Sequence, residues 1–458
     1  MLAAAAILLA ACDTTVTNPG PVPDEDLNTP LAYDAIVTGG RLALARAYGS
    51  DAGFGGTIAY WGAALSFEIN PAGSTGSFGI PTVIQAGTMT PELSNAEWSA
   101  ANLARFVAED AIRRFDAIAA ADPDAAATPR QRSEAKLYAG YAHRLLGETF
   151  CGAVLPFDNP DGSVSPGDST AHTDYFLRAE QHFTDAIQIA AGVTPDTVRE
   201  RIIRAAQAAR ASVRLDLAAW GVGGTTMWDD AAADAAAIPD TFAFRLPFSA
   251  QDQNQYNYIY WARGDSPYRA HTQWSTYFEG YYRATRAAGT PDVRAAWDST
   301  DLLGDAAVAR FGGQVPFWPE AKHDARNSPI NLSSGWEMRL VEAERQLVAG
   351  NPGPAVDLIN LRRTDLGLPI YDNGVAIDSA WSILKVERGV ELWLEARRLG
   401  DLRRWIVNAV PGSYPDGLYR LNTSDPLSPV PLENMTTPTA RSLCFPIGQN
   451  EHDTNPNL

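Results

Sequence analysis

The feature that most restricts the fold is a set of long helical segments whose apolar faces are built from alanine and aromatic residues. Segments 129–150 and 173–191 repeat apolar residues every three or four positions, which places them on one helix face. Alanine lets a second helix approach closely, and an aromatic ring fills the remaining groove. These positions are Ala135, Tyr138, Ala139, Ala142 and Leu146, then Ala179, Phe183, Ala186 and Ile187. The pattern predicts paired helices of the tetratricopeptide kind, with a plain helical bundle as the alternative.

Further helices are expected over 31–48, 96–119, 195–220, 336–349, 354–366 and 380–399. The segment 238–335 interrupts this pattern with prolines and short aromatic runs, which indicates loops, short strands and short helices. We therefore predict an all-α fold with one large irregular, loop-rich insertion. The scaffold would comprise residues 31–237, the insertion residues 238–335 would face a ligand, and residues 336–458 would close the same domain.

The chain begins with eleven apolar residues before Cys12, which is too few to span a bilayer but is typical of a secretion signal. The sequence Leu9-Ala10-Ala11-Cys12 looks like a lipobox, in which the Cys12 thiol takes a lipid. Residues 1–11 are then a lipoprotein signal peptide, and residues 12–30, which are polar and rich in proline, a flexible tether. The alternative is a short apolar tail without a function.

Two cysteines remain once Cys12 is assigned to the lipid. In an exported protein this even remainder suggests a disulfide between Cys151 and Cys444, although two buried free thiols are the alternative. The 6 histidines show no metal-binding spacing, so we expect neither a metal nor a cofactor. The net charge of −18 would repel phosphate backbones, which argues against nucleic acid as a partner.

Charged residues are densest between Trp381 and Trp405, which we predict to be one helix. Pairs of opposite charge at spacings of three or four residues would form ion pairs along its faces. The expected network consists of Glu387, Arg388, Glu391, Glu395, Arg398, Asp401 and Arg404. General acid–base catalysis is the alternative, but arginines within one turn would keep the carboxylates ionised. A structural role is therefore favoured.

The order E-R-x-x-E-L-x-x-E-x-x-R-x-x-D-L-x-R-W from Glu387 to Trp405 resembles the C-terminal signature of the RagB/SusD family. The family often has glycine at the position of Ala396. Segments 337–344, 355–363 and 445–451 are also similar to family segments, and they occur in the same order. The resemblance implies a SusD-like outer-membrane lipoprotein, not an enzyme, that caps a SusC-like TonB-dependent transporter and binds an oligosaccharide or a peptide.

Aromatic residues gather between positions 251 and 282, interleaved with amides and charged side chains. Flat rings stack on sugar faces while polar groups bind hydroxyls, so the mixture suits an oligosaccharide. The expected ligand-binding residues are Tyr260, Trp261, Trp274, Tyr277 and Tyr281, with Trp61 as a second location. The alternative is that these rings only cover the apolar face of the scaffold.

Two other classes of function compete with a binding lipoprotein. A secreted glycan-degrading enzyme would need a carboxylate pair outside the charged C-terminal segment, and no such pair is evident in the sequence. A tetratricopeptide-like scaffold that binds only proteins would leave the aromatic insertion without a role.

Overall fold

The computed structural model describes residues 24–49, 57–73, 79–85, 87–159, 164–265, 269–304, 314–413, 419–420, 430–431 and 442–458. The predicted signal peptide, Cys12 and most of the predicted tether lie outside the described residues. The last part of the tether, Asp24–Asn28, forms a 3-10 helix (η1), and the Asp24 carboxylate accepts a hydrogen bond of 2.5 Å from Arg114. Among the described helices, none is long and apolar enough to cross a membrane.

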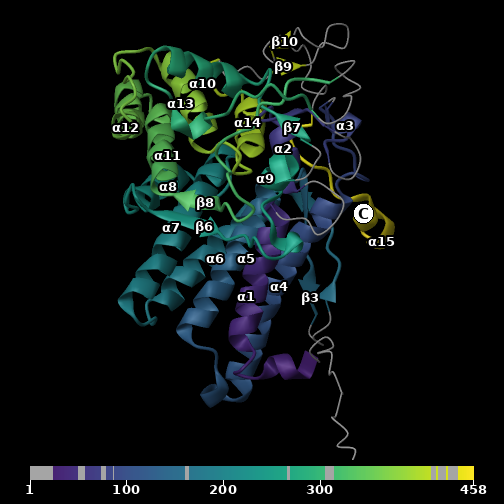
Figure 1. The fold of residues 1–458 in the computed structure, drawn as a ribbon. Helices are drawn as coiled ribbons and strands as arrows, with labels where there is room; N and C mark the ends of the chain where they lie inside the picture. The colour runs from purple at the N-terminus through teal and green to yellow at the C-terminus, as the bar shows by residue number, and fades with distance from the viewer. Residues whose placement is uncertain are drawn as a thin grey trace, which may run out of the picture.

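Helices make up most of the described structure, and the all-α fold predicted from the sequence is confirmed. They are α1 (Tyr33–Gly49), α2 (Ile58–Leu65), α3 (Thr82–Gln85), α4 (Asn95–Ala121), α5 (Pro129–Thr149), α6 (Thr173–Ala190), α7 (Asp196–Ala219), α8 (Met227–Ala236), α9 (Tyr258–Tyr260), α10 (Tyr277–Ala287), α11 (Gly335–Val348), α12 (Pro352–Asp365), α13 (Ile377–Glu391), α14 (Arg398–Val407) and α15 (Gln449–Thr454). In Figure 1 the long helices α1, α4, α5, α6 and α7 lie side by side, and successive members pack against each other. Helices α11, α12 and α13 form a second packed group.

Close packing of α5 on α6 depends on small residues in α5. A Cβ atom at Gly140 would lie 2.6 Å from a ring carbon of Phe183, and one at Gly147 would lie 2.6 Å from the ring of Phe176. No ordinary side chain fits at such distances, so each ring occupies a groove that exists only because glycine is present. Thr128 starts α5 through a capping box with Gln131.

The strands are short, and two of the pairs that they form hold the insertion in place. They are β1 (Asn70–Pro71), β2 (Gly152–Val154), β3 (Phe157–Asp158), β4 (Val164–Ser165), β5 (Ser169–Ala171), β6 (Ala243–Leu246), β7 (His271–Thr272), β8 (Ile330–Ser334), β9 (Tyr419–Arg420) and β10 (Val430–Pro431). Strands β6 and β8 pair antiparallel, with Ala243 opposite Ser334, so the insertion leaves and re-enters the scaffold at one place. Strands β1 and β7 also pair antiparallel and tie its middle to the segment after α2.

The prediction of a single helix from Trp381 to Trp405 is wrong. Helix α13 ends at Glu391, and α14 begins at Arg398. Between them the backbone turns through φ values of +60° at Leu394 and at Ala396, a conformation that favours glycine. Ala396 is the position at which the RagB/SusD signature often has glycine, so the turn accounts for that preference.

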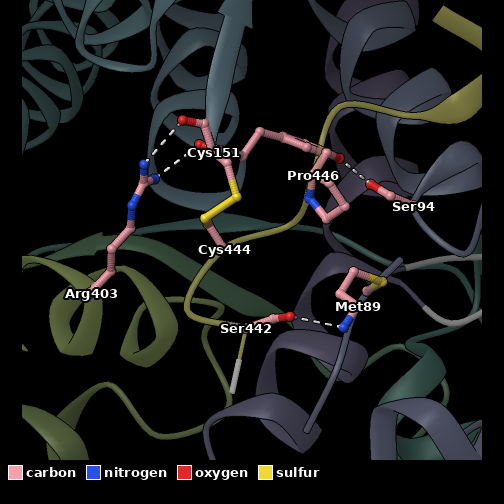
Figure 2. The surroundings of a disulfide bond; sticks show 8 residues. Met89, Ser94, Cys151, Arg403, Ser442, Cys444 and Pro446 are labelled. Carbon is pink, nitrogen blue, oxygen red and sulfur yellow. Dashed lines mark hydrogen bonds between the residues drawn. A yellow bond between two sulfur atoms is a disulfide. The ribbon is translucent and has the colours of Figure 1, made fainter. Parts of the chain in front are cut away.

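A disulfide joins Cys151, just after α5, to Cys444 near the C-terminus (Figure 2). The C-terminal segment is also held by hydrogen bonds: Ser94 donates to the Pro446 carbonyl (2.6 Å), and Ser442 accepts from the Met89 amide (2.9 Å). Arg403 of α14 donates to the Cys151 carbonyl at 3.2 Å. The end of the chain is thereby fixed against the start of the scaffold.

A ring of four buried charges links α5, α11 and the turn between α13 and α14. Arg144 lies 2.8 Å from Glu148 and 2.9 Å from Glu337, and Arg397 lies 2.8 Å and 3.0 Å from the same two carboxylates. All four residues are buried. We call these residues the buried ion-pair ring. Because each charge has two partners of opposite sign, the desolvation of the ring is compensated only while all four are present.

The substitution Glu337→Ala is expected to destabilise the fold strongly, because it leaves the Arg144 and Arg397 guanidinium groups short of a buried partner. Removing one member of a buried ion pair costs about 3–5 kcal/mol. Urea unfolding followed by circular dichroism measures the change. The matched control is Glu200→Ala, which removes an exposed ion pair with Arg204 and should cost less than about 1 kcal/mol. Equal losses in the two variants would contradict the proposed importance of the ring.

Candidate functional site

Tyr260 and Trp261 lie at the end of α9 and the start of the π-helical turn η4 (Trp261–Asp265). Asn257 caps α9 by accepting from the amides of Ile259 (3.0 Å) and Tyr260 (3.3 Å). The half-buried Trp261 ring lies 5.4 Å from the ring of Tyr258. The Arg263 guanidinium is 5.3 Å from the Tyr260 ring. Both predicted rings are therefore held in place but remain partly open to solvent.

The second predicted group lies at the start of α10. Trp274 is half-buried, and its carbonyl accepts a hydrogen bond of 2.8 Å from the Asn70 side chain. The rings of Tyr277 and Tyr281 are 5.7 Å apart. The Tyr281 hydroxyl donates to Asp292 at 2.7 Å, and burial raises the pKa of this phenol. The Tyr281 hydroxyl is thus engaged inside the protein, whereas Trp274 and Tyr277 keep part of their surface exposed.

Trp61 occupies a different environment from the other predicted residues. It lies in α2, where its side chain is 5% exposed and belongs to the main hydrophobic core. Asn70, which lies nearby in the sequence, is also buried and binds the Trp274 backbone. This segment therefore anchors the insertion, and Trp61 is not carried into the proposed ligand surface.

The structure adds a cluster that the sequence did not reveal. The Trp297 and Trp318 rings stack with centroids 5.1 Å apart and an interplanar angle of 17°. The Arg283 guanidinium of α10 lies over both, 5.4 Å and 5.3 Å from their centroids. We call Arg283, Trp297 and Trp318 the tryptophan–arginine cluster. The two tryptophans come together because Trp297 forms an isolated β-bridge with Glu320, a long-range contact that no local spacing indicates.

This cluster has the groups that recognition of a sugar needs. The Arg283 side chain is 58% exposed, and its Nε and Nη2 atoms bind Glu279 at 2.7 Å and 2.5 Å, which leaves the remaining guanidinium donors accessible to a ligand's hydroxyl groups. Trp318 is half-buried and presents indole surface beside it, whereas Trp297 is 7% exposed and supports Trp318 from below. A ring with a guanidinium at its edge can stack on an apolar sugar face and donate to its hydroxyls.

The glutamates of the C-terminal signature are buried ion-pair partners, but not of the residues predicted. One pair of the expected network has the expected spacing, Asp401 with Arg404 in α14 at 2.9 Å. The other expected pairs are replaced by contacts with other elements: Arg388 binds Asp401 across the turn at 3.0 Å, and Glu395 binds Lys322 at 2.8 Å. The remaining pairs are Glu387 with Arg363 and Arg294, Glu391 with Arg294 and Arg362, Arg404 with Glu344, and Arg398 with the Ser66 carbonyl. The prediction failed because the helix is broken, which turns these side chains toward neighbouring segments.

A family model described as the SusD family matches residues 209–458, which is more than half of the chain. The chain belongs to the SusD family. The match begins inside α7 and includes the insertion, the buried ion-pair ring's Glu337 and Arg397, and the charged C-terminal signature. No curated protein matches the sequence.

Solved structures of SusD proteins share the fold of more than nine-tenths of the chain. A SusD superfamily protein from Bacteroides vulgatus has a TM-score of 0.61 and 14% identity, over 93% of this chain and 97% of that one. A SusD/RagB family protein from Bacteroides thetaiotaomicron has a TM-score of 0.59 and 13% identity, over 91% and 94%. A laminarin-binding SusD-like protein has a TM-score of 0.58 and 14% identity, over 93% and 99%. At this identity the likeness establishes the fold.

Glu68 links the segment after α2 to the turn that follows α13. Its carboxylate accepts a hydrogen bond of 2.7 Å from the Leu394 amide and one of 3.2 Å from the Ser66 hydroxyl. Burial raises the pKa of Glu68 to about 7, although Arg398 and the Leu394 amide act in the opposite direction. The group is fixed inside the SusD fold and takes no part in a ligand surface.

This raised pKa predicts how stability depends on pH. Between about pH 4.5 and pH 7 the folded protein keeps a proton on Glu68 that the unfolded chain releases, so the free energy of unfolding falls as pH rises. Glu68→Gln removes that contribution, so the slope of the free energy of unfolding against pH should become less negative by up to about 1.4 kcal/mol per pH unit. Urea titrations at half-unit intervals measure it. An identical slope in wild type and variant would refute the prediction, and Glu200→Gln is the exposed control.

Proposed function

We propose that this SusD-family chain is a cell-surface lipoprotein that binds an oligosaccharide and delivers it to a SusC-like TonB-dependent transporter of the outer membrane. The observation that carries the proposal is the set of partly exposed rings that the insertion displays on a SusD-type helical scaffold. Binding and release require no bond to be made or broken, so the proposed protein is not an enzyme.

The choice of an oligosaccharide over a peptide is supported by chemistry and by related structures. One structure of this fold is described as binding laminarin, and another as a complex with a xylogluco-oligosaccharide. The latter has a TM-score of 0.54 and 13% identity, over 83% of this chain and 82% of that one. Both ligands present sugar faces on which aromatic rings stack. A peptide ligand is the competing outcome.

The proposed contact surface combines predicted residues with those that the structure adds. Trp261 and Trp274 offer half-buried indole rings, and Tyr260 and Tyr277 offer rings with a hydroxyl at one edge. From the tryptophan–arginine cluster, Arg283 would bind ligand hydroxyls beside Trp318. Rings that are anchored before the ligand arrives lose little conformational freedom on binding, which favours affinity.

Carboxylates in the C-terminal signature would be the first candidates if the protein were a glycan-degrading enzyme. Glu387, Glu391 and Glu395 each lie within 3.1 Å of an arginine or lysine nitrogen, and all three are buried or nearly so. A general acid must hold a proton near neutral pH and must reach the glycosidic oxygen. Carboxylates that are buried against cations do not reach a glycosidic oxygen, which supports a binding role.

Ligand binding is expected to depend on the tryptophans of the insertion. Trp261→Ala and Trp274→Ala should each weaken oligosaccharide binding about tenfold, because each removes about 1.4 kcal/mol of stacking and burial. A glycan and peptide array screened with the full chain identifies the ligand, and isothermal titration calorimetry then gives Kd for each variant.

The matched control for these variants is Trp228→Ala in α8, which removes a partly buried tryptophan that packs on a different core cluster. It should leave the ligand Kd unchanged. If Trp261→Ala and Trp274→Ala both bind the ligand like wild type, the insertion is not the ligand surface. Binding of peptides alone would overturn the choice of an oligosaccharide, and release of reducing sugar from the ligand would overturn the denial of enzyme activity.

Membrane attachment and partnership are tested together by copurification. Full chain extracted from membranes in mild detergent should elute with a large outer-membrane barrel protein, and Cys12→Ala should shift the chain to the soluble fraction. A membrane-bound chain that elutes alone would contradict the transporter partnership but not ligand binding. A Cys12→Ala chain that stays on the membrane would contradict the lipid anchor.

A further inference from the structure

Three helices of the scaffold bring two histidines and a glutamate together, far from the aromatic insertion in sequence. Glu109 comes from α4, His143 from α5 and His182 from α6. The Glu109 Oε1 atom lies 2.7 Å from His143 Nε2 and 3.9 Å from His182 Nε2. One potential ligand atom from each residue lies within 4.8 Å of the others. We call these residues the Glu109–His143–His182 cluster.

The cluster is mostly buried, but part of it is accessible to solvent. The His143 side chain is fully buried, and those of His182 and Glu109 are 15% and 21% exposed. The two imidazole rings stack at 5.3 Å with an interplanar angle of 27°. Both Nε2 atoms face the same carboxylate oxygen, so the rings need little reorganisation to act as a pair of ligands.

A hollow of about 190 Å³ opens beside the cluster, and Glu109 and His182 form part of its wall together with Leu155 and the arginines Arg105, Arg113 and Arg178. The volume is enough for several water molecules. A ligand position on this side of the cluster would therefore be open to solvent, whereas the side of His143 is closed by the protein.

The donor atoms of the cluster suit a cation. Each histidine offers an imidazole nitrogen and Glu109 offers a carboxylate oxygen, and both are ligand types that bind metal ions.

We propose that the Glu109–His143–His182 cluster binds one Zn²⁺ ion, with a water molecule from the adjacent hollow as the fourth ligand. Two nitrogens and one oxygen with an open position form a donor set that zinc accepts in tetrahedral geometry. Metal–ligand bonds of about 2.0–2.1 Å put neighbouring donor atoms about 3.3 Å apart, between the observed 2.7 Å and 3.9 Å.

The donor atoms of the cluster favour zinc over harder cations. Nitrogen donors bind Zn²⁺ in preference to Ca²⁺ or Mg²⁺, which prefer all-oxygen sites. Arg105 binds the other carboxylate oxygen, Oε2, at 2.6 Å and so leaves Oε1 as a single donor toward the histidines. The sequence offered no sign of this site, because the three residues lie on separate helices and form no short motif.

A bound zinc ion would join α4, α5 and α6 and so stabilise the scaffold. The test uses full chain without a histidine tag, stripped of metal by a chelator. Calorimetric titration with zinc chloride should show one ion per chain with a Kd of about 1 µM or tighter, and zinc should raise Tm. Cobalt(II) should give the intense visible absorption of a tetrahedral site.

Three variants decide the matter. His182→Ala and Glu109→Gln should weaken zinc binding at least a hundredfold, whereas His452→Ala, which removes an exposed histidine of α15, should bind like wild type. Circular dichroism checks that each variant folds, and the partly exposed His182 is chosen because the fully buried His143 is harder to replace. Absence of zinc binding in the wild type, or less than a tenfold change in both cluster variants, would overturn the proposal.

Discussion

The buried ion-pair ring is the interaction on which the arrangement of the two halves of the chain depends. Arg144 and Glu148 come from the scaffold, and Glu337 and Arg397 come from the segments that follow the insertion. Charges in a protein interior are tolerated only when every one is matched, so the ring admits one relative position of α5, α11 and the turn after α13. Ser212 of α7 adds a hydrogen bond of 2.8 Å to Glu337, which brings a second scaffold helix into the same arrangement.

The long scaffold helices were predictable because local sequence determines them. Helix α5 begins at a capping box and α12 begins with a proline, and the observed bounds of both differ by at most two residues from those expected. Pairing was predictable for the same reason, since alanines at close-packing positions occur on the faces that meet, and Ala139 and Ala186 are fully buried. Packing of this kind joins helices that follow each other along the chain, so a short stretch of sequence contains most of the information that determines which helices pair.

Features that depend on distant segments could not be read in the same way. The break after α13 is stabilised by the Leu394 amide donating to Glu68, a residue more than three hundred positions earlier. Helical spacing alone suggested a continuous helix there, with ion pairs along its length. The stacking of Trp297 on Trp318 likewise depends on backbone pairing between two segments, in which the Asp298 amide donates to the Pro319 carbonyl and the Ala321 amide to the Ala296 carbonyl. In both cases the deciding contacts are polar or backbone interactions with a remote segment, and no periodic pattern in the sequence indicates them.

The attachment of the insertion explains how the chain can present the proposed ligand surface without destabilising the fold. Strands β6 and β8 hold its two ends through backbone hydrogen bonds, and the Asn257 side chain holds its interior by donating to the Ser328 carbonyl at 2.8 Å. Backbone pairing is largely indifferent to side-chain identity. The half-exposed rings of Trp261, Trp274 and Trp318 can therefore be replaced without loosening the attachment, which would let one helical scaffold present different ligand surfaces.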